Sequence, residues 1–141
     1  MRQSIEESAY KKKAVENFAA AKLLQSAYPN ASASRAYYAV FLAAVGEYEK
    51  LGVKPELIDR GSADAFRETG IRWTHSFVRN NAKMLGLDSR QCEALRLSYR
   101  IRCVADYQSS PVDIVQLENV LKKVEDILEC LGVNFEDHRG S

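Results

Sequence analysis

Residues 110–132 read SPVDIVQLENVLKKVEDILECLG, and their pattern decides the class of fold. Apolar side chains recur here at alternating spacings of three and four residues: Ile114, Leu117, Leu121, Val124, Leu128 and Leu131. This spacing puts them on one stripe of an α-helix, which needs a long antiparallel partner to cover it. Ser110 matches a capping residue, Pro111 a first helical residue and Asp113 a first-turn acid. We therefore predict a helix over residues 111–131.

The rest of the chain also has the periodicity of helices and lacks the alternation of strands. We predict helices over residues 4–27, 31–51, 71–85 and 89–108, and a short helix over residues 63–67. The helix over 31–51 has two neighbouring apolar stripes, which is typical of a central helix with neighbours on both sides. These elements predict an all-α, up-down helical bundle of about five helices.

The length of the chain predicts one domain over residues 1–141, large enough to bury its own core. We place that core at about residues 4–132, followed by a polar tail over 133–141. The segment from 53 to 70 contains the least regular pattern and is long enough for a lid or an interaction loop.

The composition argues against several classes of protein. A net charge of +1 gives no large field for nucleic acid or membrane, so any nucleic-acid contact needs a local patch. The three cysteines are far apart and form no cluster with histidine, so we predict no metal, no cofactor and no disulfide. No stretch approaches the roughly 18 apolar residues of a membrane helix, and the charged start is unlike a signal peptide. We expect a reduced, cytoplasmic setting without membrane contact.

The stretch RIRCVADY, residues 100–107, raises the first question about function. Arg102 and Asp106 are four residues apart, so they are neighbours on a helix, on a stripe that borders the apolar face. One interpretation is a surface ion pair worth a few tenths of a kcal/mol. The other is a guanidinium that a carboxylate holds ready for a phosphate. Arg100 lies on the outer side with Arg96, where a basic edge is either a solvated face or a contact for a nucleic-acid backbone.

Two further stretches carry polar residues in apolar surroundings. In SRAYYAVF, residues 34–41, Arg35 enters an apolar helix and is followed by two tyrosines that cannot share one face. Tyr37 is explained by the core, and we expect the hydroxyl of Tyr38 to meet a buried polar group. In WTHSFV, residues 73–78, His75 is either structural or a general base, although no Ser, Cys or Asp stands at a recognisable spacing from it. Residues 11–13, three lysines, are typical of a solvated surface.

These three stretches, in this order, resemble HEPN domains, the small all-α domains of prokaryotic toxin–antitoxin, defence and CRISPR-associated systems. The resemblance covers about residues 5–131 and is closest to the branch with the motif R-x-x-A-D-Y, matched here by Arg102, Ala105, Asp106 and Tyr107. It implies an up-down bundle, commonly a homodimer in which the motifs of two protomers face one cleft. It also implies a minimal nucleotidyltransferase encoded nearby as a partner.

Many proteins of this family resemble metal-independent endoribonucleases whose active site is an Arg-x(4–6)-His motif. In that chemistry the imidazole moves a proton while the arginine stabilises the developing charge on phosphate. Here positions 106–109, counted from Arg102, are Asp, Tyr, Gln and Ser, and Tyr107 stands where the histidine would be. A phenol with a pKa near 10 and a carboxylate paired to arginine are both weak bases.

The leading prediction is therefore a dimeric HEPN-type component of a toxin–antitoxin or defence system that binds a nucleotide, an RNA backbone or a protein partner. The residues that we expect to form its cleft are Arg102, Asp106, Tyr107 and Arg35, with Tyr38, His75 and Arg100 as further ligand-binding candidates. One alternative is a metal-independent endoribonuclease with Arg102, Asp106 and Tyr107 as catalytic candidates. A second alternative is an interaction module without catalysis.

Overall fold

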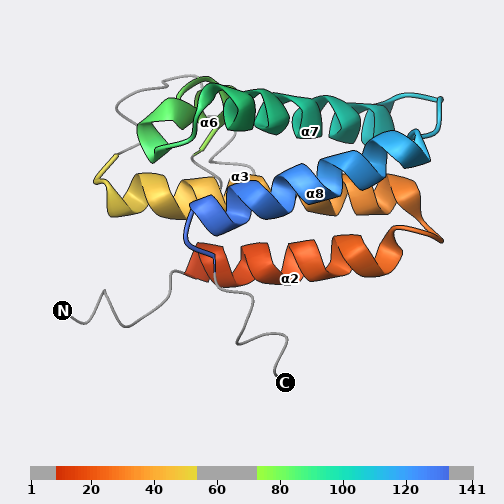
Figure 1. The fold of residues 1–141 in the computed structure, drawn as a ribbon, viewed down its shortest axis with the longest axis horizontal. Helices are drawn as coiled ribbons and strands as arrows, with labels where there is room; N and C mark the ends of the chain where they lie inside the picture. The colour runs from red at the N-terminus through yellow and green to blue at the C-terminus, as the bar shows by residue number, and fades with distance from the viewer. Residues whose placement is uncertain (1–8, 54–72, 134–141) are drawn as a thin grey trace.

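The computed structural model describes residues 9–53 and 73–133, and this part of the chain is helical without any strand. Its elements are α2 (Ala9–Leu24), α3 (Pro29–Lys50), α6 (His75–Asn80), the 3₁₀ turn η1 (Ala82–Leu85), α7 (Ser89–Tyr107) and α8 (Ile114–Cys130). The four long helices lie side by side and reverse direction at each step along the chain (Figure 1). The predicted all-α, up-down bundle is confirmed.

Helix α3 is the centre of the bundle and packs against α2, α7 and α8. It has this position because it is apolar around much of its circumference and carries small residues where its neighbours approach. The buried alanines of α3 are Ala33, Ala36, Ala39, Ala43 and Ala44. Small side chains at a helix contact shorten the distance between the helix axes. The predicted central helix and the antiparallel partner of α8, which is α7, are both confirmed (Figure 1).

Several predicted boundaries were wrong, and each has a local cause. Helix α3 starts at Pro29, because a proline in the first turn needs no hydrogen-bond partner for its nitrogen. The helix predicted over residues 71–85 is divided: Thr74 caps α6 by accepting a hydrogen bond from the backbone of Phe77, and the chain continues as the 3₁₀ turn η1. The predictions for residues before 9, for 63–67 and for nearly all of 53–70 lie outside the described residues.

The start of α8 is the clearest correction. The helix begins at Ile114, and the capping residue is Asp113, whose Oδ1 accepts a hydrogen bond from the backbone nitrogen of Gln116 at 3.0 Å. Ser110 and Pro111 lie outside the helix. The cause is tertiary: Val112 is buried, and its backbone nitrogen donates to Oδ1 of Asn30 at 3.1 Å. This contact ties the chain to α3 before the helix can begin.

Replacing Asp113 with alanine is expected to lower the free energy of unfolding by about 1 kcal/mol, the usual loss for a capping side chain. Urea denaturation followed by circular dichroism measures the change. Ser110→Ala is the matched control and is expected to change the same quantity by less than about 0.5 kcal/mol. Equal losses in the two variants would restore Ser110 as the cap.

Lys11 and Val133 also differ from the prediction. Lys11 is buried and forms an ion pair with Glu47 of α3, whereas Lys12 and Lys13 are exposed as expected. It falls on the face of α2 that packs against α3. Val133, assigned to the polar tail, is buried, because Gly132 turns with a φ of +81° and lets the chain fold back. Within the described ranges, no helix has the length and apolar character that crossing a bilayer requires.

Candidate functional site

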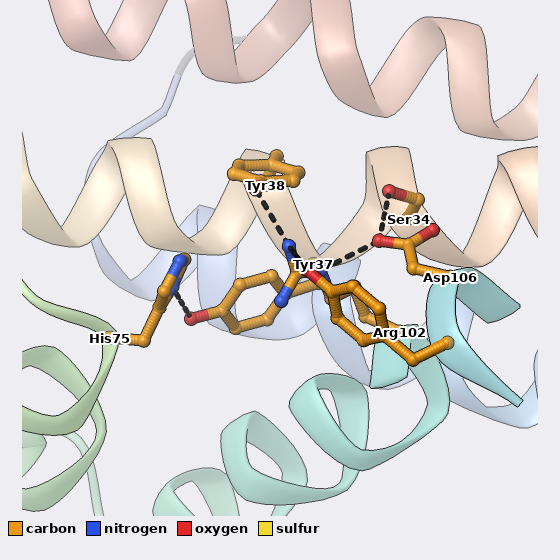
Figure 2. A network of polar contacts seen from close by, with 7 residues as sticks. Ser34, Tyr37, Tyr38, His75, Arg102 and Asp106 are labelled. Carbon is orange, nitrogen blue, oxygen red and sulfur yellow. Dashed lines mark hydrogen bonds and ion pairs between the residues drawn. The ribbon is translucent and has the colours of Figure 1, made fainter. Parts of the chain in front are cut away.

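The guanidinium of Arg102 is the centre of a polar cluster between α3 and α7. Its side chain is only 9% exposed, although it belongs to a helix with a solvated outer face. Nε lies 2.8 Å from Oδ2 of Asp106, and Nη2 donates to the hydroxyls of Tyr38 at 3.0 Å and Tyr107 at 3.3 Å. Figure 2 shows Arg102 reaching from α7 toward Tyr38 on α3, with Asp106 beside it. The expected partner of the Tyr38 hydroxyl is therefore found.

Tyrosine rings surround this cation. The Cζ atom of Arg102 lies 5.9 Å from the ring centre of Tyr37, 5.3 Å from that of Tyr38 and 5.2 Å from that of Tyr107. These distances allow each ring to attract the positive charge. Burial lowers the pKa of Arg102, whereas Tyr38, Tyr107 and Asp106 raise it. Their combined effect is larger than that of burial, so the pKa lies above its ordinary value. The guanidinium is charged at every physiological pH.

Asp106 contacts the guanidinium of Arg102 at Nε. Oδ2 of Asp106 also accepts a hydrogen bond from the hydroxyl of Ser34 at 3.3 Å (Figure 2). The predicted pairing is thus present, but it is no ordinary surface pair, because the arginine is buried. The N–H of Arg102 Nε is not aligned with the carboxylate, so the short ion pair is not a hydrogen bond. Among the buried side-chain polar atoms of the described residues, only Nε of Arg79 and Nε of Arg102 lack a hydrogen bond.

A second hydrogen-bonded pair adjoins the cation. Nδ1 of His75, on α6, lies 2.7 Å from the hydroxyl of Tyr37, which is fully buried on α3. Burial raises the pKa of Tyr37 above its ordinary value. Burial, with the positive charges of Arg102 and Arg79, lowers the pKa of His75 to about 4. Both groups are therefore neutral at pH 7, and the tautomer of the His75 imidazole decides which of the two donates the hydrogen bond (Figure 2).

The low pKa of His75 makes stability depend on pH. Unfolding returns this pKa to 6.5, so the unfolded chain binds a proton between pH 6.5 and 4 that the folded chain does not. The stabilisation is complete above pH 6.5 and is lost as the pH falls toward 4. We expect the wild-type free energy of unfolding to fall by about 2 kcal/mol more than that of His75→Asn over this range. Urea denaturation at several pH values tests this, and parallel curves for the two proteins would contradict it.

The structure does not bring every predicted residue to this cluster. Arg35 is exposed, and its Nη1 donates to Oδ1 of Asn17 on α2 at 3.3 Å. Arg100 is exposed on the outer face of α7 and pairs with Glu93 at 3.9 Å. The predicted residues that do gather are Tyr38, His75, Arg102, Asp106 and Tyr107.

The residues at the cluster that were not predicted as site residues are Ser34, Tyr37, Arg79 and Tyr99. The Cζ atom of Arg79, on α6, lies 3.9 Å from the ring centre of Tyr99 on α7. Both positions had a signal in the sequence. Arg79 follows His75 by four residues and Tyr99 precedes Arg102 by three, so each shares a helix face with a residue that had been selected.

This cluster has the chemistry of an anion site rather than a metal site. In the described part of the chain, no three His, Cys, Asp or Glu side chains gather as a metal ion requires. Two guanidiniums and a neutral imidazole lie near a single paired carboxylate. No protein-family model and no curated protein matches this sequence.

Proposed function

We propose that this chain is a HEPN-type helical bundle that binds phosphate groups of RNA or of a nucleotide at Arg102, as a component of a toxin–antitoxin or defence system. The observation that carries the proposal is the state of Arg102: its side chain is nine-tenths buried and charged, and its Nε–H has no hydrogen bond. One carboxylate, at 2.8 Å from Nε, balances this buried charge, and a phosphate would add further acceptors for the guanidinium. The resemblance of the three motifs supplies the class of protein.

A phosphate fits the local balance of charge. Asp106 is the one described carboxylate that pairs with Arg102, and its side chain is 29% exposed. Arg79 adds a second positive charge, which together with Arg102 depresses the pKa of His75. Phosphate oxygens accept hydrogen bonds from a guanidinium and neutralise this excess charge. Because the net charge of the whole chain is only +1, the attraction is local to the site.

The proposal includes a homodimer in the cytoplasm, with a minimal nucleotidyltransferase as a further partner. Three exposed apolar side chains support the dimer: Tyr107 at 72% exposed, Ile114 at 51% and Val115 at 77%. They lie where α7 ends and α8 begins, and Tyr107 also belongs to the Arg102 cluster. A symmetric contact through these residues would bring two Arg102 sites close together.

The second candidate function is a metal-independent endoribonuclease, and the observation that favours it is the position of His75. A neutral imidazole beside a guanidinium supplies the base that the motif on α7 lacks. In the tautomer that donates from Nδ1 to Tyr37, Nε2 accepts the proton of a ribose 2′-hydroxyl. The 2′-oxygen then attacks phosphorus as the bond between phosphorus and the 5′-oxygen breaks, the 5′-oxygen takes a proton from water, and Arg102 stabilises the charge on the phosphate. Asp106 and Tyr107 remain catalytic candidates. Both contact Arg102, Asp106 through an ion pair and Tyr107 through a hydrogen bond.

One incubation tests both candidates. A short single-stranded RNA with a fluorescent end is titrated with the wild-type protein in the presence of a metal chelator, and anisotropy and product size are followed together. Saturable binding without cleavage is the result expected for the leading proposal, and cleavage products would move the assignment to the endoribonuclease. Binding of neither RNA nor nucleotides would contradict both. Light scattering on the same sample is expected to give a dimer, and Val115→Asp a monomer.

A further inference from the structure

The hydroxyl of Tyr107 uses a hydrogen-bond donor of Arg102 that a phosphate needs. A guanidinium binds an oxyanion through two parallel hydrogen bonds along either of two edges, one formed by Nε with Nη2 and the other by Nη1 with Nη2. Each edge therefore uses one of the two N–H groups of Nη2. In this structure Nη2 donates to the hydroxyls of Tyr38, at 3.0 Å, and Tyr107, at 3.3 Å. Both edges are thus partly occupied by tyrosine, and a phosphate that binds through two hydrogen bonds has to replace one of these hydroxyls.

Tyr38 is the partner that is harder to replace. It lies on the central helix α3, and its partly buried side chain packs against the core. Its ring makes edge-to-face contacts with the rings of Phe41 and His75, with ring centres 6.3 Å and 6.1 Å apart. Rotation of Tyr38 away from Arg102 would break this packing, because side chains in a close-packed interior move only together with their neighbours.

Tyr107 is the partner that is easier to replace. It is the last residue of α7 and is 72% exposed, and its hydrogen bond from Nη2 is the longer of the two. Because its hydroxyl lies near water, it exchanges this bond for one to solvent at a small cost in free energy. A phosphate oxygen carries negative charge, so its hydrogen bond from a guanidinium is stronger than that of an uncharged phenol.

We propose that Tyr107 is an autoinhibitory residue of the Arg102 site: its hydroxyl occupies an N–H group of Nη2, and a phosphate displaces it in order to bind the guanidinium through two hydrogen bonds. This inference rests on the proposed function and adds a way in which the affinity of the same site is regulated. Any change that removes the Tyr107 hydroxyl or holds it away from Arg102 strengthens phosphate binding, whereas Tyr38 keeps its bond to Arg102 throughout.

Removal of the Tyr107 hydroxyl alone tests this inference. Tyr107→Phe keeps the aromatic ring, so stacking on a base and contact with a second copy are retained and only the competing acceptor is lost. We expect the affinity for the labelled single-stranded RNA, measured by anisotropy, to rise about fivefold, the size of one modest intramolecular hydrogen bond. Tyr38→Phe is expected to lower the affinity, because it removes the hydroxyl that holds the guanidinium in place. Tyr28→Phe changes another tyrosine that is 65% exposed and is the matched control, with an affinity expected within about twofold of wild type.

A double variant shows whether the hydroxyl acts through Arg102. In the Arg102→Gln background the gain from Tyr107→Phe is expected to disappear, because the N–H group for which the hydroxyl competes is no longer present. A gain of the same size in that background overturns the inference, since the hydroxyl then disfavours RNA without occupying Arg102. An unchanged or reduced affinity in Tyr107→Phe itself also overturns it, because the hydroxyl is then either not displaced or a contact of the ligand.

The two proposals fail in different ways. If neither the wild-type protein nor Tyr107→Phe binds RNA or a nucleotide, the proposed function fails and the inference falls with it. If the wild-type protein binds RNA and Arg102→Gln weakens this binding, while Tyr107→Phe does not strengthen it, only the inference fails.

Discussion

Replacing Arg102 with alanine is expected to weaken RNA binding about 30-fold. The change removes a charged donor whose hydrogen bonds to an anion are worth about 1.5–3 kcal/mol. It also leaves Asp106 without its positively charged partner, so a carboxylate that repels phosphate remains in the site. Arg102→Lys keeps the charge but cannot reproduce the two bonds from Nη2 to Tyr38 and Tyr107, so we expect an intermediate affinity.

Anisotropy titrations with one labelled RNA measure these affinities, and circular dichroism shows whether each variant is folded. Arg100→Ala is the control because Arg100 is also an arginine of α7, is exposed and pairs with Glu93. Its affinity is expected to stay within about twofold of wild type. A loss of melting temperature in Arg102→Ala with unchanged binding would favour the interaction module, in which Arg102 only joins α7 to α3 through Tyr38.

Tyr48→Ala is expected to have the largest effect on stability, a loss of about 4 kcal/mol of the free energy of unfolding. Tyr48 is fully buried on α3, and its ring stacks on Trp73 with ring centres 5.4 Å apart. Its hydroxyl donates to the backbone oxygen of Val78 on α6 at 3.2 Å. Truncation therefore leaves a cavity and frees α6, the helix that carries His75 and Arg79.

Two variants separate the parts of this effect. Tyr48→Phe removes only the hydroxyl and is expected to cost about 1 kcal/mol, with RNA affinity close to wild type. Leu23→Ala truncates a side chain that is 85% exposed and is expected to cost less than about 0.5 kcal/mol. The fluorescence of Trp73, the single tryptophan, follows unfolding in urea. A loss below about 2 kcal/mol in Tyr48→Ala would mean that α6 is not anchored through this ring.

The sequence predicts the bundle well because helical periodicity is a local property. The stripe on α8 and the double stripe on α3 follow from spacing within one segment, and the structure buries most of their residues. Ile114 is an exception at 51% exposed, because it is the first residue of its helix. The capping signal at Ser110 failed because the competing contact, from Val112 to Asn30, joins residues 82 positions apart.

The difference between contacts within one helix and contacts between distant residues also applies to the site. Arg102 and Asp106 are four residues apart on one helix, so their pairing could be predicted. The hydrogen bond between Tyr37 and His75 joins positions 38 residues apart, and the one between Arg102 and Tyr38 joins positions 64 apart. No spacing rule reaches across such distances. Sequence periodicity therefore selects candidate side chains, but only tertiary packing decides that His75 adjoins Arg102 while Arg35 and Arg100 do not.

The claim that phosphate binds the guanidinium of Arg102 is tested most directly by nuclear magnetic resonance of the arginine Nε–H groups during a titration with single-stranded RNA. Arg102→Ala identifies the resonance of Arg102, and Arg100 serves as the internal reference. We expect the Arg102 resonance to shift saturably, with the dissociation constant found by anisotropy, while that of Arg100 stays in place. RNA that binds while the Arg102 resonance does not move would show that Arg102 does not bind the phosphate.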